Sequence, residues 1–209
     1  ILELVTIDDS LPPYSDDYAI RRVTASQFKK ICLTTTPQGL LAVVRLPGDV
    51  YSALLPDDAG ARVLLLEDVQ DPGNVGSLIR TAAAFGYDGV LMSDKCADPF
   101  SPKCVQSTAG AVLSLWIRRS AEYMQAVKEL KRRGYTIVAT ALDGPDGPSV
   151  LVGMNKLVVA LGNEASGLSE AVIGVSDYCC AIPIRRESAE SLNVAACGAI
   201  CMYANVAGC

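Results

Sequence analysis

The stretch IPIRRESAESLNVAAC, from Ile182 to Cys197, organises the rest of this chain. An apolar run over residues 178–182 predicts a strand that ends at Pro183 and leads into a charged loop. Small and apolar residues in the second half of the stretch predict a helix, with Ser188 or Ser191 as its N-cap. Because the first turn of a helix has unpaired N–H groups and a positive dipole end, this junction suits a carboxylate or another anion.

Two further stretches follow the same strand–loop–helix pattern. They are DPGNVGSLIRTAAAFG, from Asp71 to Gly86, and LGNEASGLS, from Leu161 to Ser169. In this order, the three stretches resemble the motifs of the SpoU (TrmH-like) RNA ribose 2′-O-methyltransferases, a branch of the SPOUT superfamily. The resemblance covers roughly residues 61–209, and it is specific because three separated motifs must coincide. Residues 1–60 resemble the family's substrate-binding domain only loosely, mainly at Thr36 to Gly39.

Length and composition bound the architecture. The 209 residues, half of them apolar, are enough for one ample domain with a small companion. We expect a small N-terminal RNA-substrate-binding domain at 1–60, with a linker over residues 56–60, and a methyltransferase domain at 61–209. The chain begins with Ile rather than Met, so we expect the N-terminal domain to be incomplete. The sequence shows no signal peptide and no apolar run near the roughly 18 residues of a membrane span, so we expect a cytoplasmic protein.

Apolar strand patterns alternate with helical patterns from residue 62 onward. The patterns predict strands at 40–46, 63–66, 89–92, 112–117, 136–141 and 157–161, and helices at 26–32, 75–85, from 101 onward, at 120–133 and at 169–175. This alternation predicts an α/β fold with a mainly parallel sheet flanked by helices, preceded by a small α/β domain. The family resemblance implies a C-terminal trefoil knot as well.

The predicted strand ends indicate a single site. Ligands of parallel α/β sheets bind beyond the carboxyl ends of the strands. The three motifs begin at such ends, at Glu67, Leu161 and Ile182. We therefore expect the motif loops to converge.

Cysteine spacing and the lack of histidine exclude several classes of chemistry. The eight cysteines show no zinc-ribbon spacing and are interpreted as reduced cytosolic thiols rather than disulfides or metal ligands. Without histidine, Ser-His and Cys-His nucleophiles are excluded. We expect no metal.

The first motif admits competing interpretations. Gly73 and Gly76 follow a strand, but the spacing lacks the G-x-G-x-x-G fingerprint of dinucleotide binding. Asn74 suits either a helix N-cap or the motif asparagine of the family. Arg80, on a helix of small apolar residues, either extends outward to solvent or points at an anion in a cleft. The resemblance implies the second reading for both residues.

The resemblance also implies the site. Its catalytic residues would be Asn74, Arg80, Glu164, Ser191 and Asn193, and S-adenosylmethionine would bind Leu161, Gly162, Asn163, Ile182, Ser191 and Leu192. Methyl transfer from a sulfonium requires mainly positioning and the loss of one proton. A guanidinium keeps its proton at ordinary pH, so we expect Arg80 to stabilise negative charge rather than to act as a base. The family implies a homodimer in which both subunits build the site.

The net charge of −5 opposes nucleic-acid binding by bulk electrostatics. We expect RNA to contact local basic pairs, Arg185–Arg186 in the third motif and Lys29–Lys30 in the N-terminal domain. The other basic clusters, at 118–119 and 131–133, are interpreted as ordinary solvated surface. Ribosomal RNA is favoured over transfer RNA as the substrate. The alternatives are a non-catalytic RNA-binding or ribosome-associated protein with this fold and a nucleotide-dependent oxidoreductase, which the missing fingerprint disfavours.

Overall fold

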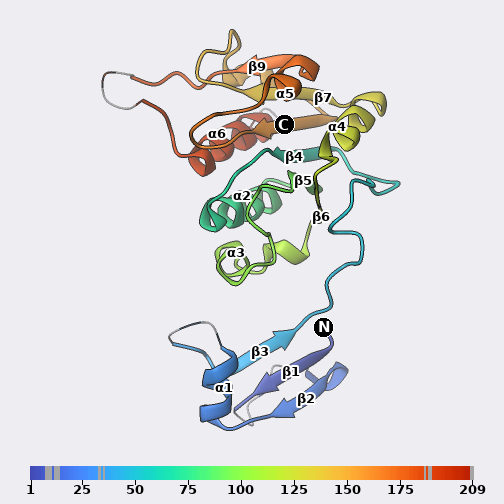
Figure 1. The fold of residues 1–209 in the computed structure, drawn as a ribbon, viewed down its shortest axis with the longest axis vertical. Coiled ribbons are helices and arrows are strands. Elements are labelled where there is room, and N and C mark those ends of the chain that lie inside the picture. Colours follow the sequence, from blue (N-terminus) through green and yellow to red (C-terminus); the bar gives the residue numbers. More distant parts are fainter. Residues whose placement is uncertain are drawn as a thin grey trace. The chain divides into compact units, whose positions relative to one another are not determined.

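The chain folds into two compact units, residues Ile1–Gly48 and Asp49–Cys209 (Figure 1). The computed structural model describes residues 1–7, 11, 15–32, 34, 36–185, 187 and 190–207. No helix in this described part of the chain has the length and apolar content needed to cross a bilayer.

The boundary between the units lies at Gly48 rather than at residue 60. Val50 and Ala59 are buried, and their carbonyl oxygens accept hydrogen bonds from the Arg119 backbone N–H (2.7 Å) and from Trp116 Nε1 (3.1 Å). The predicted linker therefore packs against the larger unit. Its Pro, Gly and Asp content indicates a surface loop but carries no information on the strand that it packs against.

The N-terminal unit is a small α/β sheet domain. Its strands β1 (Glu3–Thr6), β2 (Ala19–Arg22) and β3 (Leu40–Val43) are ordered β2-β1-β3, with a 3₁₀ turn at Ser15–Asp17 and helix α1 at Ala25–Ile31. Thr24 and Gln27 form a capping box at the start of α1, and Phe28 anchors the helix in the core. The predictions of a short helix and of a β3 strand in this region are confirmed.

The larger unit contains a six-stranded sheet with the order β6-β5-β4-β8-β7-β9, and every pairing is parallel. Its strands are β4 (Arg62–Leu66), β5 (Gly89–Ser93), β6 (Trp116–Ser120), β7 (Thr136–Thr140), β8 (Leu157–Leu161) and β9 (Tyr178–Cys180). The central strands β5 and β8 are buried along their whole length, as expected for a sheet covered on both faces. The predicted parallel α/β fold is confirmed, while the knot stays a prediction.

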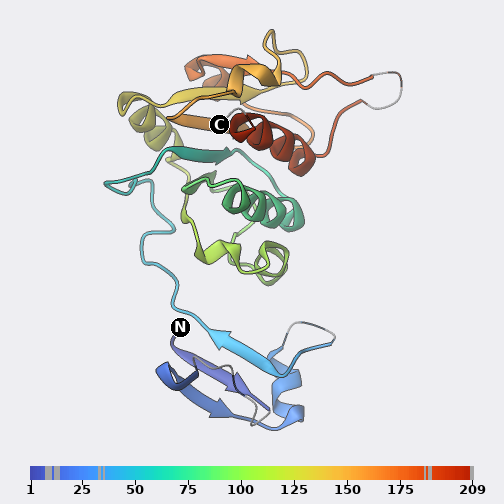
Figure 2. The same ribbon diagram turned by 180° about the vertical axis from the view of Figure 1, so that it is seen from behind.

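Helices cover both faces of this sheet (Figures 1 and 2). They are α2 (Pro72–Ala84), α3 (Pro102–Thr108), α4 (Tyr123–Arg132), α5 (Glu170–Val175) and α6 (Val194–Val206), with 3₁₀ turns at Ala111–Leu113 and Pro148–Leu151. Alternate residues of β4 separate two cores. Leu64 and Leu66 pack with residues of α2 and α6, whereas Val63 and Leu65 pack with residues of α4 and α5.

One predicted strand is wrong in its first half. Residues 111–113 form a 3₁₀ turn, and the strand begins at Trp116. Ala109 and Gly110 both adopt left-handed backbone conformations after α3, which turns the chain before the strand, and Leu113 points to solvent. An apolar run of this length does not distinguish a strand from a turn.

Arg118, Arg119 and Arg133 are committed to internal contacts, which corrects the expectation of solvated surface at these three positions, whereas Lys131 and Arg132 are exposed as expected. The Arg118 side chain is only 6% exposed, donates to the carbonyl oxygens of Leu54 (2.6 Å) and Ile117 (3.0 Å), and pairs with Asp49. Arg133 donates to Pro56 O (2.7 Å). These arginines tie residues 49–57 to the sheet domain.

We predict that Arg118→Ala lowers the free energy of unfolding by about 2–3 kcal/mol, because it removes the hydrogen bonds that an almost fully buried guanidinium makes to Leu54, Ile117 and Asp49. The matched control is Arg132→Ala. The Arg132 side chain is 77% exposed and pairs only with Glu129, so the expected loss is below about 1 kcal/mol. Urea unfolding of the two variants measures the difference, and equal losses would contradict the internal role of Arg118.

Candidate functional site

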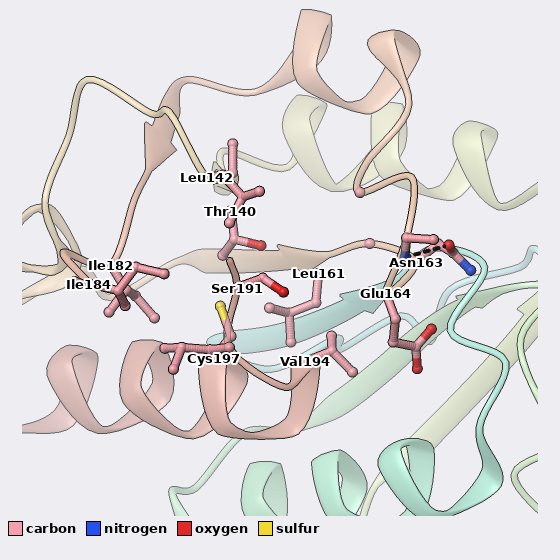
Figure 3. Close-up of a pocket in the computed structure, with 15 residues that line it drawn as sticks. Thr140, Leu142, Leu161, Asn163, Glu164, Ile182, Ile184, Ser191, Val194 and Cys197 are labelled. Atoms are coloured by element: carbon pink, nitrogen blue, oxygen red, sulfur yellow. Dashed lines mark hydrogen bonds between the residues drawn. The ribbon is translucent and has the colours of Figure 1, made fainter. Parts of the chain in front are cut away.

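A pocket lies beyond the carboxyl ends of β7 and β8 and beside the segment that follows β9 (Figure 3). Apolar and polar side chains share its wall. The lining residues are Thr140, Ala141, Leu142, Leu161, Gly162, Asn163, Glu164, Ala165, Gly167, Ile182, Ile184, Ser191, Leu192, Val194 and Cys197. The position agrees with the general location of ligand sites in parallel sheets.

The structure places all six predicted cofactor-binding residues on this wall. They are Leu161, Gly162, Asn163, Ile182, Ser191 and Leu192. The predicted catalytic residues Glu164 and Ser191 also line it. Two of the three motifs therefore meet at one pocket.

The first motif reaches the pocket through Asn74. Its Nδ2 donates to Glu164 Oε1 (2.9 Å), and its Oδ1 accepts a hydrogen bond from Asn193 Nδ2 (3.0 Å). One asparagine side chain thus joins the second and third motifs. Asn74 is not the cap of its helix, because Asp71 occupies that position and accepts from the Asn74 backbone N–H (2.9 Å).

The cap of α6 fixes the direction of this hydrogen-bond chain. Asn193 Oδ1 accepts from the backbone N–H groups of Ala195 (2.9 Å) and Ala196 (3.3 Å). Its Nδ2 must therefore face Asn74 Oδ1, and the amide of Asn74 must in turn present N–H to the carboxylate of Glu164. The prediction that Ser188 or Ser191 caps this helix is wrong for Ser191, and Ser188 lies outside the described residues.

This cap also changes the anion site expected at the start of α6. The Asn193 side chain occupies two of the first-turn N–H groups, so these donors are not open to a ligand. Ser191 remains on the pocket wall, two residues before the cap.

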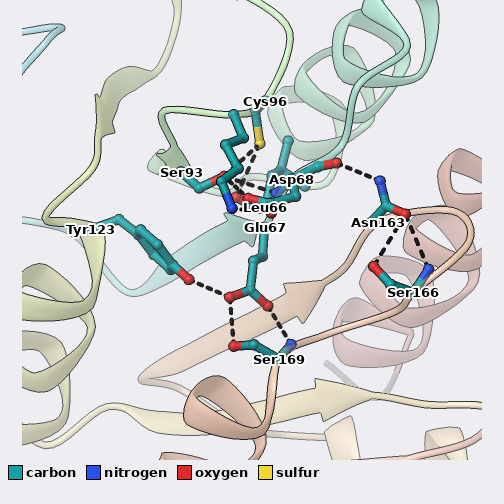
Figure 4. Close-up of polar contacts among 10 residues, drawn as sticks. Leu66, Glu67, Asp68, Ser93, Cys96, Tyr123, Asn163, Ser166 and Ser169 are labelled. Atoms are coloured by element: carbon teal, nitrogen blue, oxygen red, sulfur yellow. Dashed lines mark hydrogen bonds and ion pairs between the residues drawn. The ribbon is translucent and has the colours of Figure 1, made fainter.

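The loop that carries Glu164 is tied down at both ends (Figure 4). At one end, Asn163 Nδ2 donates to Asp68 O (2.9 Å). At the other end, the backbone N–H and the hydroxyl of Ser169 donate to Glu67 at 2.6 and 2.7 Å. Glu67 is only 4% exposed and also accepts from the Tyr123 hydroxyl. Burial, together with the hydrogen bond to Glu67, raises the pKa of Tyr123, so the Tyr123 hydroxyl keeps its proton and remains a donor.

Comparison with known proteins identifies the chain. The model of the SpoU rRNA methylase family matches residues 61–203. The chain belongs to the SpoU rRNA methylase family. It is 31% identical to the Bacillus subtilis 23S rRNA (guanosine(2553)-2′-O)-methyltransferase RlmP, over 97% of this chain and 79% of that protein.

Solved SpoU methyltransferases share the fold along the whole chain. AviRb from Streptomyces viridochromogenes, in complex with the cofactor AdoMet (S-adenosylmethionine), has a TM-score of 0.82 and 26% identity, over 99% of this chain and 82% of that one. An AdoMet-bound rRNA methyltransferase from Sinorhizobium meliloti has a TM-score of 0.82 and 26% identity, over 98% and 79% of the two chains. SpoU proteins are RNA methyltransferases that use S-adenosylmethionine as methyl donor.

Arg80 is the one predicted catalytic residue of this SpoU chain that the structure leaves apart from the pocket and from the hydrogen-bond chain. It lies on α2 six residues after Asn74, about 9 Å further along the helix. Its side chain is exposed and has no hydrogen-bond or ion-pair partner among the described residues. A cation in this state is available to an incoming anion.

The predicted RNA-binding residues lie in both units. Arg185 is exposed and directly follows the pocket residue Ile184. Arg186 lies outside the described residues. Lys29 and Lys30 are exposed in the last turn of α1.

The sequence analysis missed one wall of the pocket and the tether of its loop. Residues 140–142 line the pocket at the end of β7, and the strand-end rule applied to the other strands would have found them. The Glu67–Ser169 contact spans 102 residues, and no local pattern predicts it. Among the described residues, no group of three or more His, Cys, Asp or Glu side chains is arranged to hold a metal ion.

We predict that Glu67→Gln loosens the loop over residues 163–168. The amide keeps the shape of the carboxylate but presents its own N–H to donor groups, which costs about 1–3 kcal/mol per unpaired buried donor. Amide hydrogen exchange in this loop should therefore accelerate. Glu170→Gln, at an exposed position of the adjacent helix, is the control and should leave the exchange unchanged. Unchanged exchange in Glu67→Gln would rule out the tether.

Proposed function

We propose that this protein transfers a methyl group from S-adenosylmethionine to a ribose 2′-hydroxyl of RNA, with ribosomal RNA favoured over transfer RNA. The similarity to RlmP, whose name specifies 2′-O-methylation of 23S rRNA, supports both the position and the substrate class. Such a substrate would place the protein in the cytoplasm.

The observation that carries the proposal is the joining of the three motifs at one pocket by Asn74. The wall of that pocket fits the cofactor chemically. Leu142, Leu161, Ile182 and Ile184 offer apolar surface to an adenine ring and to the methylene groups of the methionine part, while Ser191 offers a hydroxyl group. S-adenosylmethionine supplies, when bound, a methyl group on a positively charged sulfur.

The protein's own residues must position the hydroxyl and stabilise the charge that develops on its oxygen. A ribose hydroxyl is a poor nucleophile, so alignment with the methyl group accounts for much of the rate. Glu164, held by Asn74, lies on the pocket wall as a hydrogen-bond acceptor. Ser191 flanks the same space from the third motif. We assign them to orientation of the ribose and its hydroxyl.

Arg80 acts as an electrostatic clamp on an RNA phosphate or on the developing oxyanion. Guanidinium does not release its proton at ordinary pH, so it stabilises negative charge rather than removing a proton. Its exposed side chain, which has no partner among the residues that the structure describes, is suited to that role.

A homodimer completes the proposal. Arg80 does not line the pocket of its own chain. In a dimer, the Arg80 of one copy could instead reach the pocket of the other copy. Ile200 and Tyr203 are exposed apolar residues of α6, at 39% and 60%, and the Tyr203 ring lies 6.1 Å from the ring of Phe85, the C-cap of α2, between centroids. Burial of this α2–α6 face against a second copy would stabilise such a dimer.

We predict that Arg80→Ala lowers methyl transfer by at least about 100-fold, the usual effect of removing one charge-stabilising donor. Binding of S-adenosylhomocysteine and the melting temperature should change little, because Arg80 has no partner within the described part of the chain. Arg80→Lys should also have low methyl-transfer activity, since the ammonium group of lysine cannot donate the two parallel hydrogen bonds of the planar guanidinium. The measurement is transfer of radiolabelled methyl to RNA followed by nuclease digestion to detect 2′-O-methyl nucleosides. Near-normal turnover in Arg80→Ala would remove this residue from the mechanism, and label outside the ribose would overturn the proposed function.

We predict that Arg185→Glu weakens RNA binding and lowers the slope of log affinity against log salt by roughly 0.7–0.9 for each lost phosphate contact. Affinity for S-adenosylhomocysteine should stay near normal. Lys128→Glu makes the same charge change at an exposed position of α4, whose buried residues pack on the opposite face of the sheet from α2 and α6. Filter binding over a salt series compares the two variants. Equal slopes would mean that the RNA does not contact Arg185.

A further inference from the structure

Three cysteines gather where α6 meets the end of β9. Cys180 is the last residue of β9, and Cys197 and Cys201 lie one turn apart on α6. Cys180 and Cys201 are fully buried, at 1% and 0% exposure. Cys197 is half-buried and lines the pocket, with its sulfur on the side of the helix that faces Thr140 and Ser191 (Figure 3).

The two deeper thiols make an unusual environment for a pocket-lining cysteine. Cys201 lies against both Cys180 and Cys197, and these contacts together with burial raise the pKa of its thiol. Cys201 therefore keeps its proton, and this single S–H favours negative charge on one neighbouring sulfur at a time. Contact with Cys201 lowers the pKa of Cys197, against the opposing effect of burial.

Other cysteines of the larger unit differ from Cys197 in one or both properties. Cys96 and Cys104 are buried, and burial raises the pKa of each thiol. Cys179 is half-buried like Cys197, but it does not line the pocket, and burial raises the pKa of its thiol. Among the described cysteines of this unit, Cys197 combines access from the pocket with a favoured thiolate. The thiolate is the reactive form of cysteine.

We propose that Cys197 is a site of reversible oxidation by hydrogen peroxide, and that its oxidation closes the cofactor pocket. The inference rests on the proposed function in one respect, that this pocket takes S-adenosylmethionine. The Cys197 sulfur attacks one peroxide oxygen, an S–O bond forms as the O–O bond breaks, and hydroxide leaves and takes up a proton to become water. The sulfur is oxidised to sulfenic acid and the peroxide is reduced. A small thiol reductant restores the cysteine.

The geometry gives this reaction a consequence for binding. The added oxygen lies on the pocket wall between the apolar Leu161 and Val194 and the polar Thr140 and Ser191, and it takes up space where the cofactor would pack. Bound cofactor, conversely, covers the sulfur and excludes peroxide. Oxidation and cofactor binding are therefore mutually exclusive.

Differential alkylation tests the reactivity of the thiol in the wild-type protein. A limiting amount of iodoacetamide is added, and mass spectrometry follows the labelled fractions of Cys197 and Cys179 in one sample. Cys197 should react faster, by up to about tenfold for each unit that separates the two thiol pKa values above the pH of the assay. Equal rates, or a faster Cys179, would overturn the proposal.

Repeating the alkylation with saturating S-adenosylhomocysteine tests where the sulfur points. Labelling of Cys197 should slow at least tenfold, whereas that of Cys179 should not change. Calorimetry on the same sample separates the two possible failures. If the ligand binds but Cys197 stays reactive, the thiol does not face the ligand and the proposal fails. If the ligand does not bind at all, the proposed function fails, and the alkylation rates alone decide the reactivity of Cys197.

Peroxide treatment tests the consequence. Treated wild-type protein should lose at least tenfold in affinity for S-adenosylhomocysteine and recover it with dithiothreitol. Treated Cys197→Ser should keep the affinity measured for the same variant before treatment, and Cys179→Ser should behave as wild type. Loss of binding in treated Cys197→Ser, or retained binding in wild type whose Cys197 carries one added oxygen, would overturn the proposal.

Discussion

The site depends on one chain of side-chain hydrogen bonds, from Asn193 through Asn74 to Glu164. Its two bonds join residues 119 and 90 positions apart, so three motif loops are held by a single asparagine. These hydrogen bonds can run in only one direction, because the side-chain oxygen of Asn193 already accepts from the backbone N–H groups at the start of α6. A capping interaction at one helix therefore decides which atom faces a carboxylate on another loop.

Close packing of α2, α3, α6 and β8 makes this contact possible. A Cβ at Gly198 would lie 2.4 Å from a Leu78 methyl and 2.7 Å from a Leu161 methyl, so glycine lets α6 approach both α2 and β8 without displacing these two side chains. Likewise, a Cβ at Gly76 would lie 2.6 Å from Cys104 O on α3. The Glu67 tether then holds the far end of the Glu164 loop. The same α6 packing that places Asn193 beside Asn74 also brings Cys197 to the pocket wall.

Local sequence patterns were enough to predict most elements of the larger unit and the edge of the sheet where the motifs meet, but they missed β1 and β2. The continuous apolar runs at 63–66 and 157–161 form central strands, and the strand-end rule correctly placed Leu161 and Ile182 at one pocket. Contacts between distant segments were out of reach of such patterns. The burial of Arg118 and the Glu67 tether each depend on a partner from a distant part of the chain, and Arg or Glu at those positions looks the same in the sequence whether or not the partner is present. The cap at Asn193 is local, but Ser188, Ser191 and Asn193 are all residue types that cap helices, so the sequence did not decide among them.

The central claim is that the loops joined by Asn74 form a pocket for S-adenosylmethionine. Isothermal titration calorimetry of the wild-type protein with S-adenosylhomocysteine, and in parallel with NAD⁺, tests it most directly. The account predicts saturable binding of S-adenosylhomocysteine and no binding of NAD⁺, because the first motif lacks a dinucleotide fingerprint. Binding of NAD⁺ with no response to S-adenosylhomocysteine would contradict it.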